Sequence, residues 1–230
     1  MKQYLEDPNT EFKRFEIHLS DKLKQSLSDI NIEYKNTFDH YGYANKLDLE
    51  RLNNFFINIG QNDKQNLVII ENFIAKLTKK VCDEYNRDSV WLTIRVTLPN
   101  NEFNIPRWHI DGNFFERVNN EHQSKFIMTL KGPGTLLCNA NETTRKIFFE
   151  NFQGSREISE RHKLDEILKS QKVIQLQNNQ CAIFLVGDRN IAAIHSEPPV
   201  TEPRIFISIL PGYDYQIDEW KNRKIIKRKI

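Results

Sequence analysis

Beyond residue 88, hydrophobic side chains recur at every second position in several short runs. Residues 91–98 alternate in this way, which is the period of a β-strand whose successive side chains point to opposite faces. Turn-forming residues at 131–134 and 187–188 separate further runs of the same kind, which occur at 125–130, 172–176, 181–186, 191–195 and 204–210. Short strands at regular spacing, with helices before them and in an insertion, predict a mainly β fold with flanking helices, a double-stranded β-helix (jelly roll, cupin-like).

Three segments carry helical patterns instead. Apolar residues at intervals of three and four predict the longest helix over residues 64–85. Ser20 is a suitable N-cap for a short helix that extends to about Ile30. A third helix is expected at about 158–170, whereas residues 34–54 show no clean period and are interpreted as a loop-rich cap or a lid.

These patterns divide the chain into three parts. Residues 1–88 form a helical and loop region that packs on the core, and residues 89–215 form a jelly-roll core with a helical insertion at about 140–170. Residues 216–230 form a basic tail, which is interpreted as a solvated end.

Composition excludes little except a disulfide framework and a membrane span. The three cysteines, Cys82, Cys138 and Cys181, are widely spaced without a CxxC pair, so buried thiols in a reducing compartment are expected. There is no apolar run near 18 residues and no signal-like segment, which favours a cytoplasmic protein. The net charge of +2 indicates no clear nucleic-acid partner.

The residues with the most specific chemistry are His109 and Asp111, which are two positions apart and would share one face of a strand end. An imidazole and a carboxylate presented together make two thirds of the facial triad that holds non-haem Fe(II) with open positions. His195, at the end of the run 191–195, is the expected third ligand. Gly112 would then let the chain leave the strand tightly.

Arg204 begins an otherwise apolar strand and needs an anionic partner if it points into the core. If residues 196–202 connect an antiparallel hairpin, Arg204 returns close to His195. Its planar guanidinium would hold one carboxylate of a dicarboxylic ligand through two parallel hydrogen bonds. Arg204, Phe206 and Ser208 would share a face of this strand.

In these residues the chain resembles the Fe(II)/2-oxoglutarate-dependent dioxygenases, over about residues 91–210. It is most similar to an uncharacterised bacterial group with H-x-D, a GPGT turn (here at 132–135) and an H-x-S-P-P-like segment (here at 195–199). The resemblance implies that His109, Asp111 and His195 bind the metal and do the catalysis. Arg204 would bind 2-oxoglutarate, with added hydrogen bonds from Thr129 and Ser208.

The implied activity is that of an enzyme that uses Fe(II), 2-oxoglutarate and O2. It would hydroxylate a small molecule or a protein side chain, with release of succinate and CO2. Three alternatives remain open. Glu197 could replace Asp111 as the carboxylate ligand, the protein could be a cupin-like metalloenzyme that does not use 2-oxoglutarate, or it could be a non-catalytic jelly-roll binding module.

Overall fold

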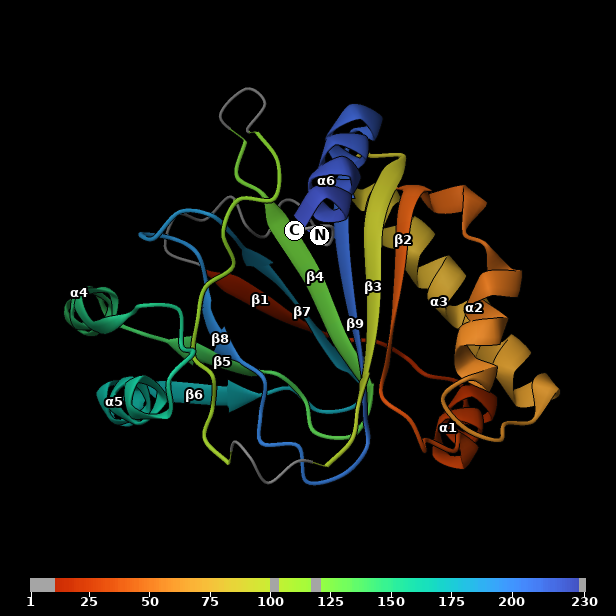
Figure 1. The fold of residues 1–230 in the computed structure, drawn as a ribbon, viewed down its shortest axis with the longest axis horizontal. Helices are drawn as coiled ribbons and strands as arrows, with labels where there is room; N and C mark the ends of the chain where they lie inside the picture. The colour runs from red at the N-terminus through yellow and green to blue at the C-terminus, as the bar shows by residue number, and fades with distance from the viewer. Residues whose placement is uncertain (1–10, 100–103, 117–120, 228–230) are drawn as a thin grey trace.

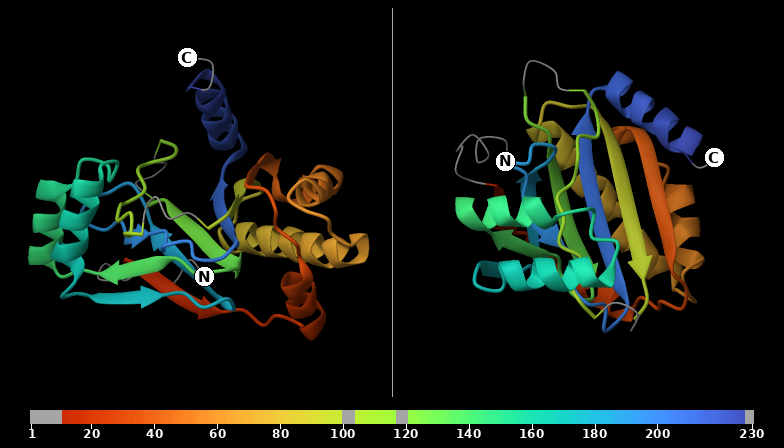
Figure 2. Two further views of the ribbon diagram at one scale, coloured as in Figure 1. Left: turned by 60° about the horizontal axis from the view of Figure 1, so that its bottom comes forward. Right: turned by 60° about the vertical axis from the view of Figure 1, so that its left-hand side comes forward.

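Two antiparallel sheets stand between two groups of helices in the computed structural model, which describes residues 11–99, 104–116 and 121–227 (Figures 1 and 2). The larger sheet has six strands in the order β1-β7-β4-β9-β3-β2. Its strands are β1 (Phe12–Glu16), β2 (Asn36–Tyr43), β3 (Ser89–Thr97), β4 (Ser124–Lys131), β7 (Gln180–Leu185) and β9 (Arg204–Gly212). The smaller sheet has the order β6-β5-β8, from β5 (Leu136–Asn139), β6 (Lys172–Gln175) and β8 (Ile194–Ser196).

Three helices cover the outer face of the large sheet: α1 (Asp21–Asp29), α2 (Leu49–Ile57) and α3 (Lys64–Glu84) (Figure 1). The even-numbered residues of β3, from Val90 to Val96, pack against them in one apolar core together with the odd-numbered residues Ile205, Ile207 and Ile209 of β9. The predicted alternation of this strand is therefore confirmed. The two helices predicted in the N-terminal part are also confirmed, as α1 and α3. The hydroxyl of Ser20 accepts a hydrogen bond from the Leu23 amide and so caps α1, as expected.

A second core fills the space between the two sheets. Trp91 of β3, Ile127 of β4 and Phe184 of β7 lie on the inner face of the large sheet, and Leu137 of β5 meets them from the small one. The outer face of the small sheet is covered by α4 (Glu142–Asn151) and α5 (Ile158–Leu168), around a third core that includes Trp108 and Phe148 (Figure 2). The order of layers is thus helices, large sheet, small sheet, helices.

The interpretation of residues 34–54 as a loop-rich cap or lid is wrong. This segment supplies β2, the short 3-10 helix η2 (Ala44–Lys46) and the start of α2. Strand β2 pairs along its whole length with β3 and forms one edge of the large sheet. The pattern was obscured because its buried positions are Phe38 and His40, and His40 reads as polar.

The fold is mainly sheet with flanking helices, as expected. Helix α6 (Asp214–Lys227) follows β9 directly and takes up most of the basic segment that was expected to be a tail. None of the helices in the described residues is both long and apolar enough to cross a membrane. All three cysteines are buried free thiols.

Candidate metal centre

His109, Asp111 and His195 come together in the space between the sheets. One potential ligand atom from each lies within 4.8 Å of the other two. The three side chains come from two segments that are far apart in the sequence, the loop around residue 109 and strand β8. These two segments are joined directly, because the backbone N–H of each histidine donates to the carbonyl of the other, both at 2.9 Å.

The alternation of side chains along the residue 109 segment explains its placement. Trp108 points away from the centre into the helical layer, where its indole N–H donates to Asp165 at 2.7 Å. The next residue must then point the opposite way, toward the inner face of the large sheet. Trp108 therefore anchors the segment from behind and fixes the direction of His109.

His195 is aimed in the same manner by β8. Its neighbour Ile194 belongs to the core beneath α4 and α5, whereas His195 pairs with Leu137 and faces the large sheet. The imidazole lies 4.6 Å, between ring centroids, from Phe184 of β7 and 4.3 Å from His109. The apolar ring of Phe184 keeps this side of the centre dry.

The hydrogen bonds of the two imidazoles leave one nitrogen of each ring open. Nδ1 of His109 lies 2.7 Å from the carbonyl of Arg107, and Nδ1 of His195 lies 3.0 Å from the carbonyl of Ala193. A carbonyl only accepts, so both Nδ1 atoms carry the proton and donate. The lone pair of a neutral imidazole is then on Nε2, which is the arrangement found in metal-binding histidines.

Asp111 is held by an ion pair that the sequence did not reveal. The ammonium group of Lys125, at the start of β4, donates to Oδ2 of Asp111 at 2.7 Å, and Nε2 of His195 lies 3.6 Å from the same oxygen. Both side chains of the ion pair are nearly buried, at 12% and 17% exposure. Lys125 shares a face with Ile127 and Thr129, so the period of two in residues 125–130 was the available signal.

The backbone at Asp111 is fixed as well. The N–H of Gly187 donates to the carbonyl of Asp111 at 2.8 Å. Gly187 has φ +92°, a left-handed backbone conformation that favours glycine, and a Cβ there would also require the Asn113 side chain to move. Gly112, by contrast, has open space where a Cβ would lie. The tight turn expected there does not need a glycine.

Burial and charge set the protonation of the cluster. Desolvation lowers the pKa of His109, and desolvation together with repulsion from His109 lowers the pKa of His195 to about 4. Burial alone would raise the pKa of Asp111, but Lys125 and the two histidines outweigh it and hold that pKa well below its ordinary range. At neutral pH the cluster thus offers two neutral imidazoles and one carboxylate, which is the protonation state that a divalent metal needs.

Glu197 lies two residues after His195, but its carboxylate is paired with Arg107. Its carboxylate accepts two hydrogen bonds from Arg107, at 2.6 and 3.1 Å. Arg107 and Glu197 flank His109 and His195 in the same antiparallel register, so this ion pair ties together the two segments that carry the histidines. The three-residue cluster contains Asp111 and not Glu197.

Arg204 lies on the inner face of β9 and is buried, with 3% of its surface exposed. Its Nε donates to the carbonyl of Pro133 at 2.8 Å, and one terminal nitrogen lies 3.1 Å from the Thr135 hydroxyl and 3.4 Å from that of Thr129. Gly132 allows the turn at 132–135 to approach the start of β9 closely. It has φ +82°, and a Cβ there would collide with the backbone of residues 203–204.

No carboxylate among the described residues forms an ion pair with Arg204. Desolvation lowers its pKa to about 10, with Glu197 acting against the shift and Arg95 adding to it. A buried guanidinium without a carboxylate partner is costly unless a ligand supplies the charge. Of the two hydroxyl residues expected to assist ligand binding, Thr129 lies against Arg204, while Ser208 lies further along the same face of β9, beside Thr93 and Ile127.

Two local expectations about these segments are wrong. The predicted hairpin between the strands of His195 and Arg204 does not form, because β8 belongs to the small sheet and β9 to the large one. The predicted strands that end at His109 and His195 are also shorter than expected. His109 makes one isolated bridge, and β8 begins only at Ile194. The residues face the same space because the two sheets face each other.

No protein-family model matches the chain, and no curated protein matches it. Among solved structures, the chain is similar to a prolyl-4-hydroxylase from Pseudomonas putida, at 11% identity over 92% of this chain and 98% of that chain, with a TM-score of 0.40. It is similar to a dioxygenase for auxin oxidation in rice, at 10% identity over 91% and 68% of the two chains, with a TM-score of 0.44. It is also similar to a prolyl hydroxylase from Trichoplax adhaerens in complex with a hypoxia inducible factor peptide fragment, at 10% identity over 93% and 89%, with a TM-score of 0.42. With TM-scores below 0.5, these likenesses carry no argument about function.

Proposed function

We propose that the protein is an Fe(II)- and 2-oxoglutarate-dependent dioxygenase with a jelly-roll core. The observation that carries the proposal is the pairing of two features on the same inner space. His109, Asp111 and His195 form a compact 2-His-1-carboxylate cluster, and Arg204 is a buried guanidinium without a carboxylate partner among the described residues.

The donor set suits Fe(II). Two imidazoles and one carboxylate that share one face of an ion leave its other coordination positions open, which is the arrangement of non-haem iron oxygenases. Two ligand atoms at about 2.1 Å from one ion are separated by at most about 4.2 Å, so the cluster needs only small side-chain movements. Bound Fe(II) would supply the activation of O2 that hydroxylates a substrate while 2-oxoglutarate is converted to succinate and CO2.

The residues of the chain have distinct tasks in this proposal. The carbonyls of Arg107 and Ala193 orient the imidazoles through Nδ1, and Lys125 keeps Asp111 ionised and in place. Arg204 receives the far carboxylate of 2-oxoglutarate through its terminal nitrogens, with Thr129 and Thr135 beside that group. Phe184 and Trp91 exclude water from the space between the sheets.

The test is an anaerobic titration of the metal-free protein with Fe(II) and then 2-oxoglutarate. Chelation of Fe(II) by the keto acid gives a weak visible charge-transfer band. We expect this band in the wild type and its loss in His109→Ala, Asp111→Ala and His195→Ala. Folded protein that binds no metal would contradict the proposal and favour a binding module.

Two controls separate the remaining alternatives. In Arg204→Ala, Fe(II) binding should persist while the band requires much more 2-oxoglutarate. If the wild type binds Fe(II) but gives no band and no succinate, and Arg204→Ala behaves like the wild type, the protein is a metalloenzyme of a different kind.

A further inference from the structure

A cavity of about 640 Å³ lies at the end of the β2–β3 ribbon, between it and the segment that follows His195. Its lining includes Lys35, Thr37, Arg95, Thr97 and Val200. We infer that this cavity binds the anionic group, a carboxylate or a phosphate monoester, of the small molecule on which the enzyme acts. The role as substrate site rests on the proposed function, whereas the anion site rests on its own contacts.

Arg95 is the central residue of the cavity. It lies on the inner face of β3, where it pairs with Thr37 on one side and Phe206 on the other. Its neighbours in β3 are buried from Ser89 to Ile94, but Arg95 itself is exposed. Among the described residues it forms neither an ion pair nor a hydrogen bond, so its five donors are available to a ligand.

Thr97 gives an independent indication of a ligand. Its hydroxyl oxygen is buried and has no hydrogen-bond partner among the described residues. Leaving a buried hydroxyl unpaired is destabilising, so such groups are normally satisfied by a partner, water or a ligand. Thr97 lines the cavity two residues from Arg95 and on the same face, so a rotation that turns its hydroxyl into the cavity would let a single anionic group satisfy both side chains.

The charged side chains among the described residues that line the cavity are all positive. Lys35 adds a second cation to Arg95, and none of the described residues that line the cavity is acidic. The size is within the range of small-molecule sites, which is about 300–1,000 Å³. Arginine combined with hydroxyl donors is a usual way to bind carboxylate and phosphate oxygens.

The cavity adjoins the proposed co-substrate site. Thr97 pairs with Arg204, and Arg95 pairs with Phe206, whose ring centroid lies 4.7 Å from the Arg204 guanidinium. Arg95 is also close enough to lower the pKa of Arg204. An anion held by Arg95 would therefore lie at the same end of the inner space as the far carboxylate of 2-oxoglutarate, and would offset the mutual repulsion of the two arginines.

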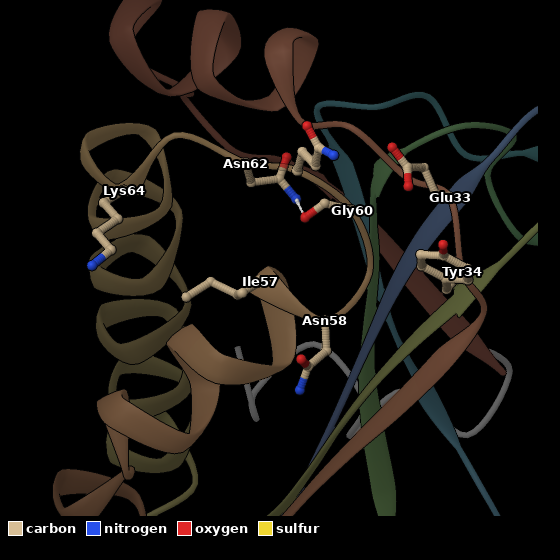
Figure 3. A pocket seen from close by; sticks show the side chains of 8 residues that line it. Glu33, Tyr34, Ile57, Asn58, Gly60, Asn62 and Lys64 are labelled. Carbon is tan, nitrogen blue, oxygen red and sulfur yellow. Dashed lines mark hydrogen bonds between the residues drawn. The ribbon is translucent and has the colours of Figure 1, made fainter.

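A second cavity shows the contrast. It has about 710 Å³ and lies in the helical layer, between α2, the start of α3 and residues 33–34 (Figure 3). Its charged side chains, Glu33 and Lys64, are of opposite sign, and Asn62 is fully used in hydrogen bonds to backbone atoms, including the carbonyl of Gly60 (Figure 3). None of the described residues that line this cavity has a buried polar atom without a partner, so nothing among them requires a ligand.

The experiment uses metal-free protein without 2-oxoglutarate, with citrate and inorganic phosphate as probes, and measures binding by calorimetry. We expect saturable binding of at least one probe, weakened about tenfold or more in Arg95→Ala and severalfold in Thr97→Val and Lys35→Ala. Arg14→Ala is the matched control, since Arg14 is exposed on β1 at the opposite edge of the sheet, and it should bind like the wild type. Equal binding in the wild type and Arg95→Ala, or no binding at all, would overturn the inference.

A second arm separates this site from the co-substrate site. The 2-oxoglutarate midpoint of the Fe(II) charge-transfer band should change little in Arg95→Ala and strongly in Arg204→Ala. An equally large change in both variants would assign Arg95 to the co-substrate and overturn the inference. If the wild type gives no band, the proposed function fails, but the calorimetry on metal-free protein still decides whether the cavity binds anions.

Discussion

The ammonium nitrogen of Lys125 lies 2.7 Å from Oδ2 of Asp111, inside the space between the two sheets. It occupies a position beside the one carboxylate that the proposed metal needs. The ion pair keeps Asp111 ionised and in place without a metal. The oxygen that Lys125 holds also lies 3.6 Å from Nε2 of His195, so a metal at the cluster would compete with Lys125 for it. Lys125 is therefore a positioning residue for the centre.

Lys125→Met should reveal this role through opposite effects on stability and metal binding. Removing one partner of a nearly buried ion pair leaves the other charge uncompensated, so we expect the metal-free protein to lose roughly 3 kcal/mol of unfolding free energy. The rise in melting temperature on adding Fe(II) should be larger than in the wild type, because the metal no longer competes with a cation. Lys125→Arg keeps the charge and should resemble the wild type. Unchanged stability of metal-free Lys125→Met would contradict this assignment.

Glu197→Gln tests which carboxylate binds the metal. The Arg107–Glu197 ion pair is 36% exposed on each side, so its loss should cost at most about 1 kcal/mol. Metal affinity should remain within severalfold of the wild type, since Glu197 is occupied by Arg107. Asp111→Asn should abolish metal binding under the same conditions, as measured by calorimetry. The reverse result would make Glu197 the ligand.

The buried histidines predict a loss of stability in mild acid. The pKa of His195 is lowered from 6.5 to about 4 by burial and by His109, so the unfolded chain binds more protons between these values. The contribution of neutral His195 to the unfolding free energy is fully present above pH 6.5 and is lost as the pH falls toward 4. For His195 alone the loss from pH 8 to pH 5 is roughly 2 kcal/mol.

The measurement is urea unfolding of the metal-free protein, compared with His195→Gln. The comparison is necessary because Glu11, whose pKa burial raises to about 7, acts in the opposite direction over the same pH range. The wild type should lose about 2 kcal/mol more than His195→Gln on going from pH 8 to pH 5. Parallel pH profiles would show that His195 is not held neutral in the folded protein.

Arg204→Met should separate stability from ligand binding. The substitution removes the desolvation cost of a buried charge, which is stabilising. It also removes the hydrogen bonds to Pro133, Thr135 and Thr129, which is destabilising, and the two effects nearly cancel. We expect the unfolding free energy to change by about 1 kcal/mol or less, while 2-oxoglutarate affinity falls about 100-fold. Arg204→Lys should be intermediate, since lysine cannot make two parallel bonds. Full affinity in Arg204→Met would remove Arg204 from the site.

The proximity of His109, Asp111 and His195 was easier to predict from the sequence than the path of the chain around them. His109 and Asp111 were found because a spacing of two is short enough to be read locally, and His195 because of its place at the end of an apolar run. The predicted hairpin from His195 to Arg204 does not form, because strands that are adjacent along the chain here belong to different sheets. Whether two strands pair or face each other across a core depends on long-range packing that no local pattern records.

The missed residues have a common cause. Lys125 was overlooked because a lysine at the start of a strand usually faces solvent, and only its partner Asp111 explains its burial. Strand β2 was overlooked because its buried His40 interrupts the apolar alternation. In both cases tertiary contacts outweighed the local preference of the residue.

Metal titration of the protein from which all metal has been removed tests the central claim most directly. We expect one Fe(II) per chain, with binding abolished in each of His109→Ala, Asp111→Ala and His195→Ala. His162→Ala, a change on the exposed side of α5, should bind like the wild type. Retention of the single tight site in any of the three cluster variants, while that variant remains folded, would contradict the account.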